Sequence, residues 1–143
     1  MPGPLSGIRI LDFTTMMSGP LATMLLGDQG ADVIKIETPS GELMRKVGNT
    51  RRGLSDAFQC SNRSKRSLSI DLKTPAGLAV VKRLVKTSDV LVQNYRPGAI
   101  ERLGLAEKEV RKLRDDIIFV SINGVGESGP YSNQRIYDPM IQA

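Results

Sequence analysis

Short apolar runs alternate with helix-like segments along the whole chain, and this order most strongly limits the folds that it can adopt. Five runs have the character of buried strands: residues 8–13, 31–37, 66–72, 89–93 and 117–122. Four segments between them have helical spacing or helix-start signals: residues 21–28, the segment that begins at Thr74-Pro75, residues 99–103 and residues 106–114. Strands separated by helices pair in parallel. We therefore predict an α/β fold with a Rossmann-like open parallel sheet and flanking helices.

The segment 38–62 breaks this order. It contains three glycines and one proline, and its apolar residues show weak periodicity. An irregular segment of this length inside a compact domain is usually functional or mobile. We expect only a short helix within it, near residues 43–47. The length of 143 residues fits one domain, so we treat 1–143 as a single region.

Residue types that are rare or absent exclude several classes of chemistry. The chain has no histidine, which excludes a Ser-His or Cys-His nucleophile pair within it and a histidine-based zinc site. Its single cysteine, Cys60, excludes an internal disulfide, and we interpret it as a half-buried thiol in a reducing compartment. No run of 18 apolar residues and no targeting segment is visible, so we expect a cytoplasmic protein without a membrane span and without a metal site.

The net charge of +5 leaves two kinds of partner open. One is nucleic acid, and the other is a polyanionic small ligand such as a phosphorylated cofactor. Aromatic residues make up only 4% of the chain and do not alternate with basic ones, which argues against stacking on single-stranded nucleic acid. Duplex binding would have to show steep salt dependence.

Three loops that follow strands carry suggestive chemistry: residues 14–19, 94–98 and 123–137. Ligands of open parallel sheets lie beyond the carboxyl ends of the strands. A helix opening at Gly19-Pro20 would offer free N–H groups to an anion, and a guanidinium such as that of Arg96 matches phosphate geometry. Tyr95 offers an aromatic face that could stack on a base.

Each of these features also has a purely structural interpretation. Gly-Pro begins many helices that bind nothing, and Met16 and Met17 are of a type that more often fills core gaps. The basic run at residues 62–66 is usually a solvated loop. Tyr137-Asp138 could be a pair of site residues, or only a helix start with a capping acid.

Five blocks of sequence, taken together, are more specific than any single loop. They are PLSGIRILDFT, GP.ATMLLGDQGADVIKIE (with a dot for Leu21), NRSKRSLSIDLKTPAG, DVLVQNYRPGAIERLGL and IIFVSINGVGESGPYSN. In this order and spacing they resemble family III CoA-transferases, the family of formyl-CoA transferase and carnitine CoA-transferase, to which alpha-methylacyl-CoA racemase is related. The resemblance implies a Rossmann-like N-terminal domain, an interlocked homodimer, coenzyme A or acyl-CoA as substrate, a carboxylic acid as acceptor, no tightly bound cofactor and no nucleic-acid partner.

The resemblance also assigns a set of residues to coenzyme A. They are Met16, Met17, Ser18, Leu72, Lys73, Asn94, Tyr95, Arg96, Arg102, Leu103, Arg135, Ile136 and Tyr137. The first three are expected near the thioester, where a passing arm needs small or soft residues, and the next two near the adenine nucleotide. The following five resemble the family's CoA-binding block, and the last three resemble the segment that closes over the pantetheine.

Two departures from the family pattern bear on the substrate. Formyl-CoA transferase has a glutamine where this chain has Met17, and a methionine cannot donate an amide hydrogen bond to a small carboxylate. We therefore expect an acyl group that is bulkier or more apolar than formyl or oxalyl. The racemase has a catalytic histidine where this chain has Tyr137, so racemisation by that mechanism is not expected.

The family's nucleophile is an aspartate that forms an acyl-enzyme anhydride, and the resemblance places it beyond Ala143. Asp138 matches no family nucleophile. The resemblance thus implies that this chain is the N-terminal part of a CoA-transferase, an incomplete domain that contributes CoA-binding residues and no catalytic residue. The alternatives are a truncated, non-catalytic CoA-binding module and, less favoured, a relative of the racemase.

Overall fold

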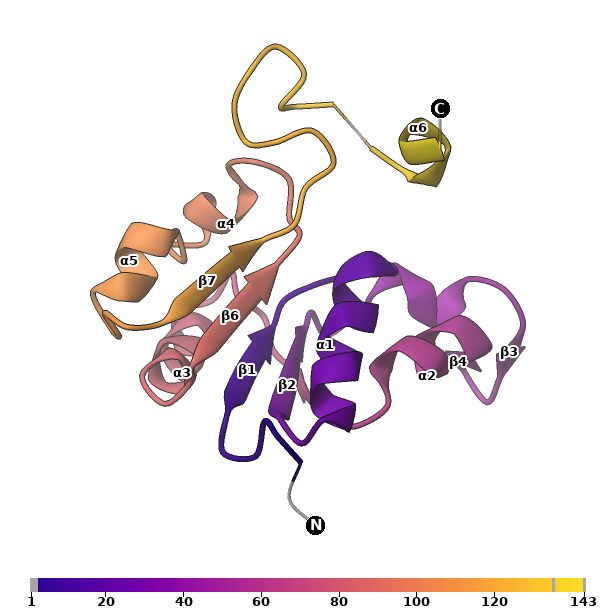
Figure 1. Ribbon diagram of the computed structural model, residues 1–143, viewed down its shortest axis with the longest axis horizontal. Coiled ribbons are helices and arrows are strands. Elements are labelled where there is room, and N and C mark those ends of the chain that lie inside the picture. The colour runs from indigo at the N-terminus through magenta and orange to yellow at the C-terminus, as the bar shows by residue number, and fades with distance from the viewer. Residues whose placement is uncertain (1–2, 135, 143) are drawn as a thin grey trace.

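A five-stranded parallel sheet forms the centre of the computed structural model, which describes residues 3–134 and 136–142 (Figure 1). The order of strands across the sheet is β5-β2-β1-β6-β7. The strands are β1 (Arg9–Asp12), β2 (Asp32–Glu37), β5 (Lys65–Ser69), β6 (Val90–Gln93) and β7 (Ile118–Ser121). The predicted α/β class and parallel sheet are confirmed, and four of the five strands lie within one residue of their expected bounds.

Helices cover both faces of this sheet (Figure 1). They are α1 (Ser18–Asp28), α2 (Asp56–Asn62), α3 (Pro75–Val85), α4 (Ala99–Arg102) and α5 (Glu107–Arg111). The last helix, α6 (Asp138–Gln142), lies apart from the sheet, at the end of the loop after β7 (Figure 1). The larger core joins one face of the sheet to α3, α4 and α5, and it includes Leu11, Leu91 and Val81. The smaller core lies on the α1 face and includes Ile10 and Val33. Because neighbouring strand residues face opposite ways, β1, β2, β6 and β7 each contribute to both cores.

The parallel register brings the carboxyl ends of the strands to one edge. Leu11 of β1 pairs with Ile34 of β2 and with Leu91 of β6, and Leu91 pairs in turn with Phe119 of β7. The arrowheads of β1, β6 and β7 consequently point the same way in Figure 1. The loops that follow these three neighbouring strands therefore leave from the same edge of the sheet, as the sequence predicts.

Helix α1 begins at Ser18, three residues before its predicted start at residue 21. The Gly-Pro pair does not open the helix but lies in its first turn. Pro20 is tolerated there because the first N–H groups of a helix have no intrahelical partner. Gly19 is buried, and a Cβ atom at this position would collide with the side chain of Thr14. The glycine is therefore required by packing.

The segment 38–62 is more ordered than its sequence predicts. The expected short helix is present as a 3-10 helix, η1 (Leu43–Lys46). It is followed by a small antiparallel hairpin of β3 (Thr50–Arg51) and β4 (Leu54–Ser55), and then by α2. The hairpin turn places Arg52 and Gly53 at positive φ, the geometry of a two-residue type I′ turn. Arg-Gly is a weaker signal for this turn than Asn-Gly, which explains why the hairpin was not predicted.

Strand β5 ends at Ser69, three residues before the predicted end at residue 72. Its partner β2 ends at Glu37, which pairs with Ser69 and accepts one further hydrogen bond from the N–H of Ile70 at 2.8 Å. Beyond that point there is no partner backbone, and the chain turns towards α3. Leu72 is buried in the larger core through this turn and not through a strand.

Candidate ligand site at the carboxyl edge of the sheet

The loop between β1 and α1 is held by side chains of β1, of β2 and of the residue that follows β6. The N–H of Thr14 donates to Asp12 Oδ1 at 2.9 Å, and its carbonyl oxygen accepts from Lys35 Nζ of β2 at 2.9 Å. The N–H of Thr15 donates to Asn94 Oδ1 at 2.9 Å, and its carbonyl accepts from Asn94 Nδ2 at 2.8 Å. Four successive backbone groups are thus fixed before the loop turns at Met16, whose φ is 67°.

A buried ionic cluster lies beneath this loop on the α1 face of the sheet. Lys65 Nζ donates to Asp12 Oδ2 at 2.8 Å, to the Pro20 carbonyl at 2.8 Å and to Asn62 Oδ1 at 2.9 Å. Asp12 Oδ2 also accepts from the hydroxyl of Thr23 at 2.7 Å. These contacts tie β1, α1 and β5 together. The interpretation of residues 62–66 as a solvated basic loop is therefore wrong for Lys65, which is a buried structural cation.

Electrostatics keep Asp12 ionised in spite of its burial. Burial alone would raise the pKa of this carboxyl, but the ammonium groups of Lys35 and Lys65 hold its pKa below the ordinary value. Hydrogen bonds from Lys65 and Thr14 act in the same direction. Since a buried carboxylate is stable only when paired, Asp12 fixes Lys65 and, through Thr14, the loop above them.

Glu42 is the least well satisfied member of the cluster. Its carboxylate lies 3.4 Å from Lys35 Nζ, both side chains are only 2% exposed, and neither carboxylate oxygen has a hydrogen-bond partner. Burial raises the pKa of Glu42, and repulsion by Glu37 and Asp12 adds to this effect, while Lys35 opposes it. This carboxyl therefore ionises less readily than its neighbours.

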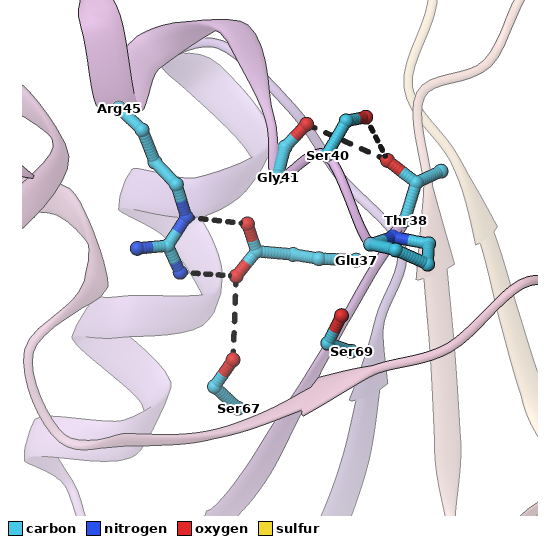
Figure 2. Close-up of a pocket in the computed structure, with 8 residues that line it drawn as sticks. Glu37, Thr38, Ser40, Gly41, Arg45, Ser67 and Ser69 are labelled. Carbon is cyan, nitrogen blue, oxygen red and sulfur yellow. Dashed lines mark hydrogen bonds and ion pairs between the residues drawn. The ribbon is translucent and has the colours of Figure 1, made fainter.

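A hollow of about 210 Å³ lies beside this cluster, where β2 and β5 end. Figure 2 shows that Arg45 faces Glu37, with Nε at 2.7 Å and Nη2 at 2.6 Å from the two carboxylate oxygens. The guanidinium also stacks over the ring of Phe58, 3.9 Å from its centroid. The positive charge of Arg45 is therefore neutralised by Glu37. The groups that the hollow presents to a ligand are mainly the hydroxyl groups of the surrounding serine and threonine side chains.

A second hollow, of about 400 Å³, brings together residues that the sequence analysis took from two separate blocks. It is lined by Leu72, Lys73, Thr74, Pro75, Leu78, Arg102 and Leu103. Four of these residues were predicted to contact coenzyme A. Within the described residues, neither of the two cations lining this hollow takes part in an ion pair, so both charges are free to meet an anion.

The loop after β6 lies next to this second hollow. Gly98 has a φ of 80°, and a Cβ atom there would lie 3.0 Å from Nη1 of Arg102, so the glycine leaves room for the guanidinium. Arg96 is exposed. Tyr95 is partly buried against the larger core, and burial raises the pKa of its hydroxyl. Much of this ring is thus already packed against protein.

The loop after β7 is set apart from the other two in Figure 1. Ile136 packs against Gly124, where any Cβ atom would collide with it, and Tyr137 is 58% exposed. Among residues 3–134 and 136–142, no hydrogen bond or ion pair joins Ile136 or Tyr137 to the loops after β1 and β6. Arg135, which was also predicted to bind coenzyme A, lies outside the described residues.

The three residues predicted near the thioester lie together at the start of α1. Met16 is half-buried, whereas Met17 is 64% exposed and Ser18 is also exposed. The interpretation of the two methionines as core residues is thus wrong for Met17.

Cys60 is exposed on α2 and not half-buried, because the helix turns its outer face to solvent.

Sequence reasoning missed the charged residues that support the site. The sequence gives little indication that Lys35 and Glu42 are buried, since Lys35 interrupts an apolar strand and Glu42 lies in an irregular segment. A lysine inside a run as apolar as residues 31–37 is the one visible hint that a buried counter-ion exists.

In the described part of the chain, no group of three or more histidine, cysteine or acidic side chains could hold a metal ion, and no helix is long and apolar enough to cross a membrane.

The fold and the loops at its edge together define a class: an α/β protein of the doubly wound type, in which ligands are expected beyond the carboxyl ends of the strands. The profile of the family described as CoA-transferase family III matches residues 5–143. The chain therefore belongs to CoA-transferase family III.

Known proteins support this assignment in sequence and in structure. Succinyl-CoA:glutarate CoA-transferase from Mus musculus is 43% identical over 145 residues, which cover 98% of this chain and 33% of the relative. Formyl-CoA:oxalate CoA-transferase from Streptomyces avermitilis is 40% identical, covering 100% of this chain and 35% of the relative. The crystal structure of a CAIB/BAIF family protein from Brucella suis superposes with a TM-score of 0.94 at 35% identity, covering 99% of this chain and 39% of that one.

This chain spans about a third of the length of these curated relatives. A hypothetical protein from Mycobacterium tuberculosis gives the same picture, with a TM-score of 0.88, 38% identity and coverage of 95% of this chain but 38% of its own. The similarity thus concerns the N-terminal parallel-sheet region of the family.

Proposed function

We propose that the whole protein transfers coenzyme A between an acyl-CoA and a carboxylic acid, and that residues 1–143 contribute most of its CoA-binding surface. A carboxylate nucleophile outside this chain would attack the thioester carbonyl. The C–S bond breaks, the CoA thiolate leaves, and an acyl-aspartyl anhydride remains on the enzyme. Backbone N–H groups would stabilise the oxyanion that forms during the attack.

The observation that carries this proposal is the second hollow. Lys73 and Arg102 come from segments about thirty residues apart, yet both line it together with Leu72 and Leu103. Two free cations beside apolar side chains suit a ligand that combines phosphates with an adenine ring. We therefore place the adenine nucleotide of coenzyme A in this hollow, with Tyr95 and Arg96 beside it.

The pantetheine arm would then run along the edge of the sheet from this hollow towards the β1–α1 loop. Asn94 lies between the two regions because it follows β6, the strand next to β1. In this arrangement the thioester lies near Met16, Met17 and Ser18. Arg135, Ile136 and Tyr137 would close over the arm when the ligand is bound.

The side chain of Met17 indicates which class of acyl group the protein would accept under this proposal. Its side chain is 64% exposed beside the loop and offers no amide hydrogen. We propose an acyl group larger than formyl or oxalyl, which a soft thioether can contact. The relative from Mus musculus is named for succinyl-CoA and glutarate, whose acyl groups are of that larger size.

Homodimer formation and a cytoplasmic location belong to the same proposal. They rest on the family resemblance and on the lone thiol of Cys60. The chain without its nucleophile is expected to bind coenzyme A and to give no transferase turnover. Turnover by residues 1–143 alone would contradict this assignment of the nucleophile.

Calorimetric titration with coenzyme A and with dephospho-CoA tests the binding site. We expect Arg102→Ala and Lys73→Ala each to weaken coenzyme A binding by about tenfold, the loss of one charge-assisted hydrogen bond. The variant that loses the 3′-phosphate contact should show a much smaller loss with dephospho-CoA. Lys108→Ala is the matched control, because Lys108 is an exposed cation of α5 that does not line the hollow. Equal affinity in all variants would contradict the placement of the nucleotide.

The alternatives differ in measurable ways. A non-catalytic CoA-binding module would bind coenzyme A equally well but would show no transfer even in the longest natural form of the protein. A racemase relative would exchange the α-proton of a 2-methylacyl-CoA with solvent deuterium. The absence of histidine from this chain gives no support to that reaction.

A further inference from the structure

The Asn94 side chain continues the pairing of β1 and β6 beyond the point where their backbones separate. The last backbone contact of this ladder is the N–H of Phe13 donating to the Val92 carbonyl at 2.8 Å. Two residues further along each strand, the carboxamide of Asn94 takes the place of a peptide group. It accepts from the N–H of Thr15 at 2.9 Å and donates to its carbonyl at 2.8 Å. An amide can fill both roles because it carries a donor and an acceptor in one plane.

This contact lies directly before a strained residue. Met16 has a φ of 67°, a left-handed conformation that is unfavourable for a residue with a Cβ atom. Such a conformation persists only when the surroundings determine it. The backbone groups of Thr14 are held by Asp12 and Lys35, and those of Thr15 are held by Asn94. Asn94 is therefore the last constraint before the chain turns.

We propose that Asn94 is a positioning residue that holds the β1–α1 loop in the shape required at the acyl end of the substrate. This role rests on the proposed function, in which Met16, Met17 and Ser18 lie near the thioester. It replaces the direct ligand contact that the sequence analysis assigned to Asn94, because one acceptor site and one N–H of the carboxamide are already bound to Thr15. The adenine end of the ligand, in the hollow at Lys73, does not depend on this loop.

The test uses Asn94→Ala and Asn94→Asp in the full-length protein, with two ligands and one exchange measurement. The aspartate keeps an acceptor for the N–H of Thr15 but turns a second oxygen towards its carbonyl. Val85→Ala is the control for general destabilisation, because Val85 is fully buried at the C-terminal end of α3, away from the carboxyl edge. Binding of acetyl-CoA and of adenosine 3′,5′-bisphosphate is measured by calorimetry, and amide hydrogen exchange is followed over residues 15–18.

A positioning role predicts that the Asn94 variants lose affinity for one of the two ligands and keep it for the other. Acetyl-CoA affinity should fall by about tenfold in both Asn94 variants, whereas the affinity for the bisphosphate should change by less than twofold. Exchange over residues 15–18 should speed up by about tenfold or more, while the amides of β1 and β6 stay protected. The control should change neither the ratio of the two affinities nor exchange in the loop.

Three other results would overturn the proposal. Weaker acetyl-CoA binding with unchanged loop exchange would mean that Asn94 touches the ligand directly. If Val85→Ala also weakened acetyl-CoA binding but not bisphosphate binding, any loss of stability would be enough to cause this difference in affinity. Wild-type affinity in both Asn94 variants would mean that the loop does not need the contact. If the parent protein binds neither ligand, the proposed function fails, and exchange alone then decides whether Asn94 holds the loop.

Discussion

At the scale of single residues, a cluster of buried charged side chains supports the edge of the sheet. Asp12, Lys35 and Lys65 lie on the α1 face of the sheet, where the smaller core would otherwise be purely apolar. Each buried ion is stabilised by a partner of opposite charge, Lys65 by Asp12 and Lys35 by Glu42. The cluster therefore links β1, β2 and β5 at the point where the β1–α1 loop begins, so stability and the geometry of this loop depend on the same side chains.

Glu42 provides a prediction with a definite sign. Its pKa is raised in the folded protein, chiefly by burial, so the folded state binds this proton more tightly than the unfolded state. Its contribution to stability is thus most favourable below the unfolded pKa and declines as the pH rises through the folded pKa. Glu42→Gln removes the charge with little change of shape. We expect the variant to be more stable than the parent at pH 7, and this gain to vanish towards pH 4.

Glu109 supplies the control for this measurement, because its pKa is shifted the other way. A hydrogen bond from Lys112 lowers it, so any stabilisation is present above the unfolded pKa and is lost as the pH falls. Glu109→Gln should therefore give no gain at pH 7. Urea unfolding of both variants between pH 4 and pH 7 makes the comparison. A stability loss in Glu42→Gln at pH 7 would show that attraction to Lys35 outweighs burial.

At the scale of elements, the strands and the first turn of α3 were predictable because their signals are local. The run at residues 89–93 is apolar and short, and Thr74-Pro75 is a capping pair, as the bond from the Gly77 N–H to Thr74 Oγ1 at 3.1 Å confirms. The end of β5 was not predictable, since it depends on where β2 stops. The burial of Lys65 was hidden for a similar reason, because its partner Asp12 lies 53 residues away in the sequence.

Helix α2 was missed although its cap is present in the sequence. Ser55 precedes it, and its hydroxyl accepts from the N–H of Phe58 at 3.0 Å while donating to the carbonyl of Met44. A seven-residue helix with one buried aromatic residue has too little periodicity to stand out in an irregular segment. The cap therefore stabilises the helix, and through Met44 it also joins α2 to η1.

Ser55→Ala tests this connection. We expect a loss of about 1–3 kcal/mol in the free energy of unfolding, because a helix cap is lost and a carbonyl near the core is left without a partner. Ser6→Ala is the control, since Ser6 is an exposed serine at the opposite end of the sheet and should change stability by less than about 0.5 kcal/mol. Equal midpoints of urea unfolding for both variants would contradict the role of Ser55.

For the molecule as a whole, the distribution of charge favours a small anion over nucleic acid. Much of the positive charge is used internally, as in the ion pairs of Arg9 and Arg66 with Asp32 and of Arg114 with Asp89. Lys73 and Arg102, which line one hollow, form no ion pair within the described part of the chain. Lys73 and Arg102 thus offer unpaired positive charge at a hollow of about 400 Å³, which suits a small anion such as a phosphorylated ligand.

A salt titration distinguishes the two partners that the sequence left open. We expect the dissociation constant of coenzyme A to rise by on the order of tenfold between about 0.05 and 0.5 M NaCl, because the phosphates meet partly exposed cations. A short duplex DNA should neither bind at physiological salt nor compete with coenzyme A. Tight duplex binding with a steeper salt slope, unaffected by coenzyme A, would favour the nucleic-acid alternative.

The contact between Gly19 and Thr14 has a consequence for how such chains diverge in evolution. Any side chain at position 19 would displace Thr14, whose backbone is fixed by Asp12 and Lys35, whatever ligand the protein uses. Met17, two residues earlier, projects into solvent and meets no such limit. Under the proposed function, a change of acyl group can therefore be accommodated at position 17 at little cost to folding. Position 19 is thus restricted by the packing of the fold, whereas position 17 is left free to vary.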